Sequence, residues 1–161
     1  MKTSLFKKCP VCEMELQDHQ YMNSYLSIDY YFCSEQCSKA FELHPHLYLG
    51  RPGGKKSLKK RGRHVIKTRK LQSLHKSASI NDIRNALTGV MGIKDILFNN
   101  DCFYIQYDLM EVTWNEILAC LKNMNLLKNL NLLLRFKYYF IDYVEENERS
   151  NLEDDINPGC H

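Results

Sequence analysis

Hydrophobic residues recur with helical spacing in two stretches of the chain from residue 79 onward. The first stretch follows Ser79 and the second follows Thr113. Serine and threonine are common helix N-caps, because their side chains accept a hydrogen bond from a backbone N–H two or three residues on. Apolar residues at i, i+3 and i+4 then share one face of each predicted helix. These residues are Ile80, Ile83, Ala86, Leu87 and Val90 in the first helix, and Trp114, Ile117, Leu118, Leu121 and Met124 in the second.

Strands are predicted around these helices. Residues 65–71 precede the first helix, and residues 93–98 and 102–107 flank the turn sequence Asn-Asn-Asp, which is typical of a hairpin. A weak last strand after the second helix would complete the order β-α-β-β-α-β. The pattern therefore predicts an α+β fold with a small sheet.

A further amphipathic helix is predicted after Asn125. We expect it to pack on the open face of the small sheet, and a helix on a membrane surface is the alternative. An acidic tail is predicted from Asp142 onward. The apolar residues of the helix are Leu126, Leu127, Leu130, Leu133, Leu134, Phe140, Ile141 and Val144.

The N-terminal part of the chain holds four cysteines in two short pairs. Cys9 and Cys12 are separated by two residues, and Cys33 and Cys37 by three. Two pairs with this spacing can bring four thiolates onto one tetrahedral ion, with Zn–S distances of about 2.3 Å. A strand over residues 25–32 and a helix capped by Ser34 should place the second pair together. Zinc is the metal that this pattern predicts.

Free buried cysteines and disulfides are the alternatives at these positions. Apolar residues occur only in patches in this segment, so it needs a staple to fold, and a structural metal would supply one. Seven cysteines, an odd number, fit a reducing compartment better than a closed disulfide framework. No signal peptide and no run of about 20 apolar residues is seen, so we expect a cytoplasmic protein. Cys160 and His161 at the end of the chain could capture a soft metal ion.

Residues 7–50 resemble a YHS domain of the TRASH-like zinc-knuckle group. The resemblance rests on the sequences C-P-V-C-E-M, Y-Y-F-C-S-E-Q-C-S-K-A-F and H-P-H-L-Y. It implies metal ligands at Cys12, Cys33 and Cys37, and a link to metal sensing, metal trafficking or metal-transporting ATPases. Many members have Asp at the position of Cys9. His44 and His46 are therefore alternatives to Cys9 as the fourth ligand.

A basic segment, residues 51–63, follows this region and has seven Lys and Arg residues in thirteen positions. The whole chain has a net charge of only +3. We predict a linker that like charges keep extended and mobile. Such a segment can also bind nucleic acid, an anionic membrane surface or an acidic partner.

Residues 64–126 resemble a heavy-metal-associated domain, the ferredoxin-like module of copper chaperones and ATPase tails. The resemblance rests on the order of elements and on the sequences G-V-M-G-I-K-D-I and Y-D-L-M-E-V-T-W-N-E-I-L. It aligns the two metal cysteines of that family with Lys76 and Ser79, which are not soft-metal ligands. We therefore expect no metal at that loop. Cys102 and Cys120 are expected to pack in the core or at its edge.

These observations predict an α+β protein of four segments. They are a zinc-binding YHS-like domain (1–50), a basic linker (51–63), a heavy-metal-associated-like domain (64–126), and an amphipathic helix with an acidic tail (127–161). No phosphate-binding loop, nucleophile elbow or H-E-x-x-H motif is present, so no enzyme activity is expected.

The predicted function is metal binding in heavy-metal homeostasis or transport. The protein would act as an adaptor or chaperone-like accessory to a metal transporter, and a zinc-knuckle nucleic-acid-binding or transcriptional regulatory protein is the alternative. The predicted zinc ligands are Cys9, Cys12, Cys33 and Cys37.

Overall fold

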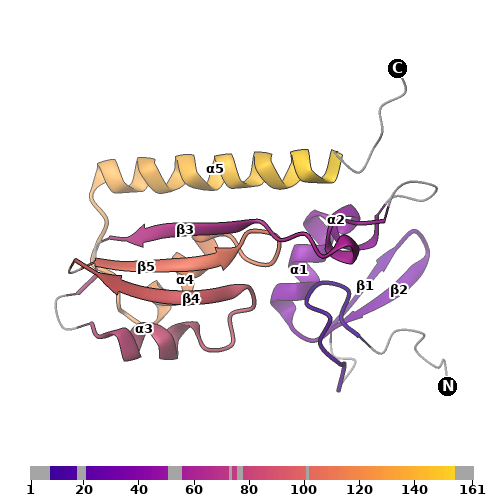
Figure 1. Cartoon of the computed structure of the whole chain (residues 1–161), viewed down its shortest axis with the longest axis horizontal. Helices are drawn as coiled ribbons and strands as arrows, with labels where there is room; N and C mark the ends of the chain where they lie inside the picture. The colour runs from indigo at the N-terminus through magenta and orange to yellow at the C-terminus, as the bar shows by residue number, and fades with distance from the viewer. Residues whose placement is uncertain are drawn as a thin grey trace. The chain divides into compact units, whose positions relative to one another are not determined.

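The computed structural model describes residues 8–17, 21–50, 56–72, 74–75, 78–100 and 102–154. The chain forms two compact units, which we call unit 1 (residues 1–64 and 149–161) and unit 2 (residues 65–148). Each unit has one small antiparallel sheet and its own helices (Figure 1). The predicted α+β class is therefore confirmed.

The sheet of unit 1 is a two-stranded hairpin. Strand β1 (Tyr21–Tyr25) pairs with β2 (Ile28–Phe32) across a two-residue turn at Leu26 and Ser27. These two residues have φ of +49° and +62°, the positive values that type I′ hairpin turns require. The prediction of one strand over residues 25–32 was wrong, because neither turn residue is one of the Gly, Asn or Asp residues that usually mark such a turn.

Two helices follow the hairpin in unit 1, α1 (Glu35–Leu43) and α2 (Pro45–Leu49). The proline of α2 stands at its first position, where the missing N–H costs nothing. Phe41 of α1 packs against Phe32 and Tyr48, with ring centroids 5.0 Å and 6.3 Å apart. All three rings are buried, so this aromatic cluster forms the core of unit 1.

Part of the basic segment folds into unit 1. Residues Lys59–Arg61 form a short 3-10 helix, η1, and the side chains of Ser57, Leu58 and Lys59 are buried. The prediction of an extended segment was therefore wrong for these residues, because the single apolar residue, Leu58, is anchored in the core. Residues 51–55 lie outside the described part of the chain.

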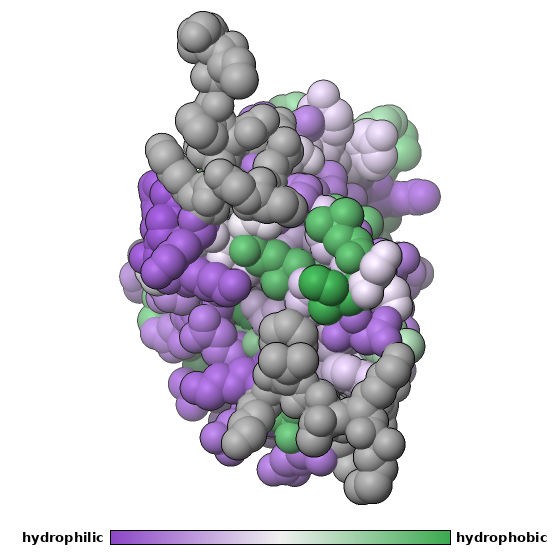
Figure 2. Space-filling view, turned by 90° about the vertical axis from the view of Figure 1, so that its right-hand side faces the viewer, coloured by the Kyte–Doolittle hydropathy of each residue, from purple (hydrophilic) through white to green (hydrophobic). Residues whose placement is uncertain are grey.

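Hydrophobic side chains also reach the surface of unit 1 near the hairpin, including Met22, Leu26 and Ile28. Figure 2 shows the side that carries β1 and β2, and hydrophobic residues gather near the middle of that view. More than half of the accessible surface of a folded protein is apolar, and a small exposed apolar patch is common. We assign no role to them.

Unit 2 follows the predicted order of elements for its first five members. These are β3 (Ile66–Leu71), α3 (Ile80–Leu87), β4 (Ile93–Asn99), β5 (Cys102–Asp108) and α4 (Trp114–Asn123). The sheet has the antiparallel order β3-β5-β4.

The caps predicted for α3 and α4 are confirmed. The Ser79 side chain accepts a hydrogen bond from the N–H of Asp82, and Thr113 does the same for Glu116, with both acids bonding back to form capping boxes. The packed faces of α3 and α4 include Ile83, Leu87, Trp114, Ile117 and Leu121, which join the core of unit 2.

The predicted last strand is not present as a strand in the described residues. Only an isolated bridge between Leu74 and Leu127 stands in its place. The long helix α5 (Leu132–Asp154) follows. The ferredoxin-like assignment of unit 2 therefore stays a prediction.

Helix α5 differs from the prediction in three ways. It begins at Leu132 and not directly after Asn125, so Leu126, Leu127 and Leu130 lie before it. It continues past Asp142 as a regular helix through residue 154, where an acidic tail was expected. Leu134 and Ile141 pack on the core of unit 2, as predicted for this helix, and Tyr138, which was not predicted to do so, packs there as well. However, other apolar residues assigned to its packed face, including Phe140, are exposed. Among the described residues, no helix has both the length and the hydrophobicity needed to cross a bilayer.

Candidate metal centre

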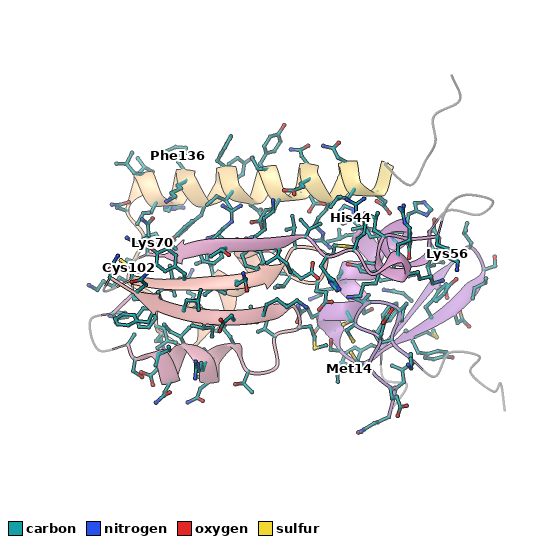
Figure 3. The ribbon with its side chains drawn as sticks, viewed as in Figure 1. Met14, His44, Lys56, Lys70, Cys102 and Phe136 are labelled. Carbon is teal, nitrogen blue, oxygen red and sulfur yellow. The ribbon has the colours of Figure 1, made fainter. Side chains whose placement is uncertain are left out.

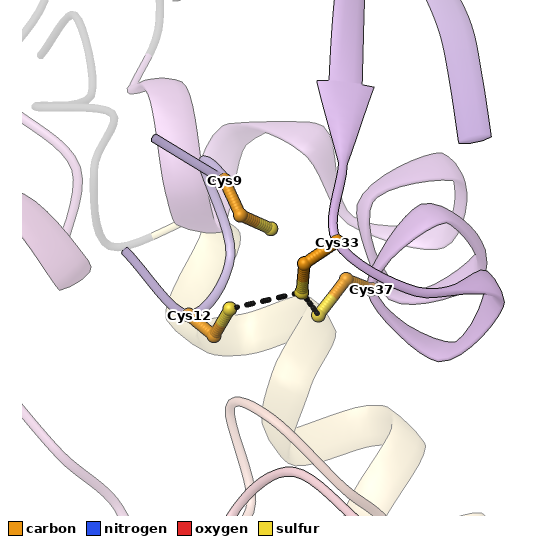
Figure 4. A group of neighbouring side chains, drawn as sticks. All are labelled: Cys9, Cys12, Cys33 and Cys37. Atoms are coloured by element: carbon orange, nitrogen blue, oxygen red, sulfur yellow. Dashed lines mark hydrogen bonds between the residues drawn. The ribbon is translucent and has the colours of Figure 1, made fainter. Parts of the chain in front are cut away.

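The first cysteine pair lies in a tight turn at the start of the described chain. Lys8 and Glu15 form an antiparallel bridge, and the N–H of Cys9 donates to the carbonyl oxygen of Met14 at 2.8 Å. The N–H of Glu13 donates back to the carbonyl oxygen of Cys9 at 2.9 Å. This turn brings Cys9 and Cys12 to one side of the chain, where they lie beside the second pair (Figure 4).

The second pair lies at a strand-to-helix junction. Cys33 follows the last residue of β2, and Cys37 lies in the first turn of α1. The hydroxyl of Ser34 caps this helix by accepting a hydrogen bond from the N–H of Cys37 at 3.3 Å. The cap fixes the start of the helix, so the two Sγ atoms stand 3.7 Å apart.

All four sulfur atoms lie within 4.8 Å of one another. The Sγ atoms of Cys12 and Cys33 are 3.3 Å apart (Figure 4). A tetrahedron with Zn–S distances of about 2.3 Å has S···S edges of about 3.8 Å, so the group has the size of a zinc–thiolate site. A disulfide needs about 2.05 Å, and the four cysteines are free thiols. The residues therefore fit a four-coordinate metal ion.

The thiols perturb one another because they are crowded and partly buried. Hydrogen bonds from the Cys12 and Cys37 thiols hold the pKa of Cys9 far below its ordinary value. Hydrogen bonding with Cys12 and Cys9, together with burial, raises the pKa of Cys37. The ionisation of Cys9 is thus favoured, and the ionisation of Cys37 is disfavoured. A divalent cation would remove this conflict, because it stabilises all four thiolates together.

The two histidines considered as the fourth ligand are engaged elsewhere. His44 is buried, with Nδ1 3.1 Å from Oε2 of Glu153. The backbone N–H of His46 donates to Oε1 of the same carboxylate at 2.8 Å, and its ring Nε2 lies 3.2 Å from the hydroxyl of Tyr25. Neither histidine belongs to the sulfur group, which includes Cys9 instead.

Glu153 is the partner of His44 and His46 in unit 1, and the sequence did not indicate it. Burial raises the pKa of the Glu153 carboxyl. Hydrogen bonds from His44 and from the N–H of His46 lower this pKa by a larger amount, so it lies below its ordinary value. The start of a helix favours a carboxylate, because its first N–H groups, here that of His46, have no partner within the helix. The partner itself could not be found from the sequence, because it lies more than 100 positions away.

The remaining candidate residues have other places. Ser79 is occupied as the cap of α3. Cys120 packs against the core of unit 2, where burial raises the pKa of its thiol, and Cys102 is half-buried at the start of β5. Lys76, Cys160 and His161 lie outside the described residues.

The family model of the YHS domain matches residues 8–51, which include all four cysteines of the group. No curated protein and no solved structure matches the chain significantly. Residues 8–51 therefore match a YHS domain, and the cysteine cluster within them is compatible with a zinc knuckle. The heavy-metal-associated assignment of residues 64–126 stays a prediction.

Proposed function

We propose that the protein binds one zinc ion through Cys9, Cys12, Cys33 and Cys37 and acts in heavy-metal homeostasis or transport. The observation that carries the proposal is the mutual distance of the four sulfur atoms, at most 4.8 Å. Sulfur-only tetrahedral sites suit zinc, whereas oxygen-rich octahedral sites suit magnesium, calcium or manganese. The YHS match over the same residues supports this assignment.

The proposed ion has a structural role. Four thiolates complete a tetrahedron and leave no open position for a substrate or an activated water. Ligation would join the turn at Cys9 to the strand-to-helix junction at Cys33, which the small aromatic core around Phe41 cannot do alone. We therefore assign the protein a binding role and no catalytic step.

Within this proposal, unit 2 is a scaffold in a cytoplasmic adaptor or chaperone-like accessory to a metal transporter. Two observations support the scaffold role. Ser79, aligned with a metal cysteine of the heavy-metal-associated family, is committed to capping α3. The cysteines described in unit 2, Cys102 and Cys120, stand on different elements, β5 and α4.

A nucleic-acid-binding zinc protein is the second candidate. The observation in its favour is a set of exposed cations that remains in the basic segment, namely Lys56, Lys60, Arg61 and Arg63. Phosphate contacts of this kind give affinity without sequence preference. Phosphate contacts alone give weak binding, so a nucleic-acid-binding function requires sub-micromolar, sequence-dependent binding at physiological salt.

Elemental analysis of the purified full chain tests the zinc proposal, with an expected content of one zinc per chain. Cys33→Ser should reduce the content to near zero, because three thiolates and a hydroxyl hold zinc far less well. Cys120→Ser is the matched control and should keep the metal. Full zinc in Cys33→Ser would contradict the proposed ligands. If Cys9→Ser is the one ligand variant that retains zinc, the fourth ligand is not Cys9. Competition between zinc and copper for the wild-type chain identifies the preferred metal.

A further inference from the structure

Helix α5 carries hydrophobic side chains on two opposite faces between residues 132 and 144. One face packs on the core of unit 2 through Leu134, Tyr138 and Ile141. The other, which we call the outer face, consists of Leu132, Leu133, Phe136, Tyr139, Phe140, Tyr143 and Val144, all exposed. Figure 3 shows Phe136 on the side of α5 turned away from β3. A helix that is hydrophobic all round is normally buried.

The exposed apolar area is large enough for a stable interface. The four aromatic side chains of the outer face are 60% to 74% exposed. At about 200 Å² for each aromatic side chain they present roughly 500 Å². Leu132, Leu133 and Val144 bring the total close to the roughly 800 Å² per partner of a standard interface.

The spacing of the outer face suits a second helix. Leu132, Phe136, Tyr139 and Tyr143 are separated by four, three and four positions, the alternation that keeps a seam of side chains facing a partner helix. A hollow of about 460 Å³ lies beside this seam. It is lined by Leu132, Arg135, Phe136 and Tyr139, and it can receive large side chains of a partner helix.

Charges of opposite sign lie along one margin of the outer face, the line where this face meets the packed face of α5. Arg135 stands near the start of the helix, and Glu146 stands three turns later on the same margin. In an antiparallel pair of helices the same margins meet, so each arginine would lie beside the glutamate of the other copy. In a parallel pair the like charges would lie at the same height. The helix is therefore electrostatically complementary to an antiparallel copy of itself.

We propose that the outer face of α5 is the interface of an antiparallel homodimer, with Phe136 and Tyr143 packed against the second copy. A membrane surface fits less well. Helices that lie on membranes have a strongly cationic polar face in contact with lipid headgroups, whereas the face of α5 opposite the outer face is buried in unit 2. The margin of the outer face also carries both signs of charge.

The mass of the full chain in solution, measured by light scattering and by sedimentation equilibrium over a range of concentrations, tests the interface. We expect a dimer. Phe136→Glu and Tyr143→Glu should each give a monomer with unchanged helix content and unchanged Trp114 fluorescence. Leu43→Glu is the matched control, because Leu43 is equally exposed on α1, and it should remain a dimer. A wild-type monomer at every concentration, or a Phe136→Glu dimer, would overturn the proposal.

Charge exchange tests the antiparallel arrangement. Arg135→Glu or Glu146→Arg should weaken the dimer by up to about fivefold for each of its two symmetric contacts. The double variant R135E/E146R should restore the dimer. In a parallel pair these residues would stand about 16 Å apart along the axis, so the double variant would not restore it. Binding of a monomeric wild-type chain to anionic phospholipid vesicles would assign the outer face to membranes and overturn the proposal.

Discussion

Arg69 of β3 donates a hydrogen bond from Nε to Oε1 of Glu145 on α5 at 2.8 Å, and this pair links the sheet of unit 2 to the long helix. The glutamate is fully buried. It also accepts a hydrogen bond from the Tyr107 hydroxyl and one from the backbone N–H of Trp114 at 2.7 Å. The carboxylate therefore has three donors and tolerates its burial.

Removal of this carboxylate should be costly. Glu145→Ala leaves the Arg69 guanidinium and the Trp114 N–H without their partner, so we expect the free energy of unfolding of unit 2 to fall by about 3 kcal/mol. Urea titration followed by the fluorescence of Trp114, the single tryptophan, measures this loss. Glu148→Ala is the control on the same helix. Its partner Lys67 is partly exposed, and the loss should not exceed about 1 kcal/mol.

Asp142, a second acidic residue of α5, should lower the stability of unit 2, whereas Glu145 raises it. Burial, followed by the charges of Glu145, Glu146 and Glu116, raises the pKa of Asp142. A raised pKa means that the folded state binds a proton more tightly than the unfolded state, so this group lowers the stability as pH rises through the carboxyl range. Asp142→Asn should therefore stabilise unit 2 at pH 7, and most of the gain should be lost by about pH 3, below the ordinary pKa of 3.8. An equal gain at both pH values would exclude ionisation as the cause.

Removal of the metal should unfold unit 1 and leave unit 2 folded. A chelator would withdraw the proposed ion, and ligation supplies much of the folding free energy of small zinc domains. The four thiols should then react rapidly with a thiol reagent, while the fluorescence of Trp114 in unit 2 stays unchanged. A parallel loss of the tryptophan signal would show that both units unfold together.

Ser79 should behave as a helix cap. Ser79→Ala removes the acceptor of the Asp82 N–H, and we expect a loss of about 1 kcal/mol in the stability of unit 2. Ser79→Asp keeps a side-chain acceptor and should retain most of the stability. Uptake of Cu(I) by the zinc-loaded chain should be the same in both variants. A change in copper uptake would show that the residue takes part in metal binding.

The basic segment decides between the two candidate functions. On the adaptor proposal, duplex DNA should bind with dissociation constants of roughly 10⁻⁴ to 10⁻⁶ M, without sequence preference, and should dissociate at physiological salt. Fluorescence anisotropy at low and physiological salt measures this. Neutralising the seven basic residues of 51–63 should abolish the salt-dependent binding. Sub-micromolar, sequence-dependent binding at physiological salt would instead support a nucleic-acid-binding regulator.

Local signals in the sequence predicted much of unit 2. Ser79 and Thr113 begin α3 and α4 as expected, because a cap and the apolar spacing after it are encoded within a few residues. The group of four cysteines was also expected from spacing alone, since two short pairs leave few other arrangements.

Features that depend on distant partners could not be predicted. Leu58 is buried within a segment whose composition indicates a solvated linker, because its contacts come from elsewhere in unit 1. The acidic end of α5 looked like a tail, since Glu145 and Glu153 find their hydrogen-bond partners 76 and 109 positions away. The exposure of Phe140 was also missed, because periodicity does not show which of two apolar faces is covered.

The turn at Leu26 and Ser27 has a consequence for the exchange of the proposed zinc ion. Two residues other than glycine in the left-handed region cost about 1 to 2 kcal/mol each, and this cost is present whenever the hairpin is formed. The strain lowers the fraction of metal-free chains in which Cys33 is already in place, and so weakens the apparent affinity for zinc. An Asn-Gly turn would relieve the strain and slow the loss of metal to competing thiols. A turn that contains no ligand thus sets how readily the proposed ion exchanges.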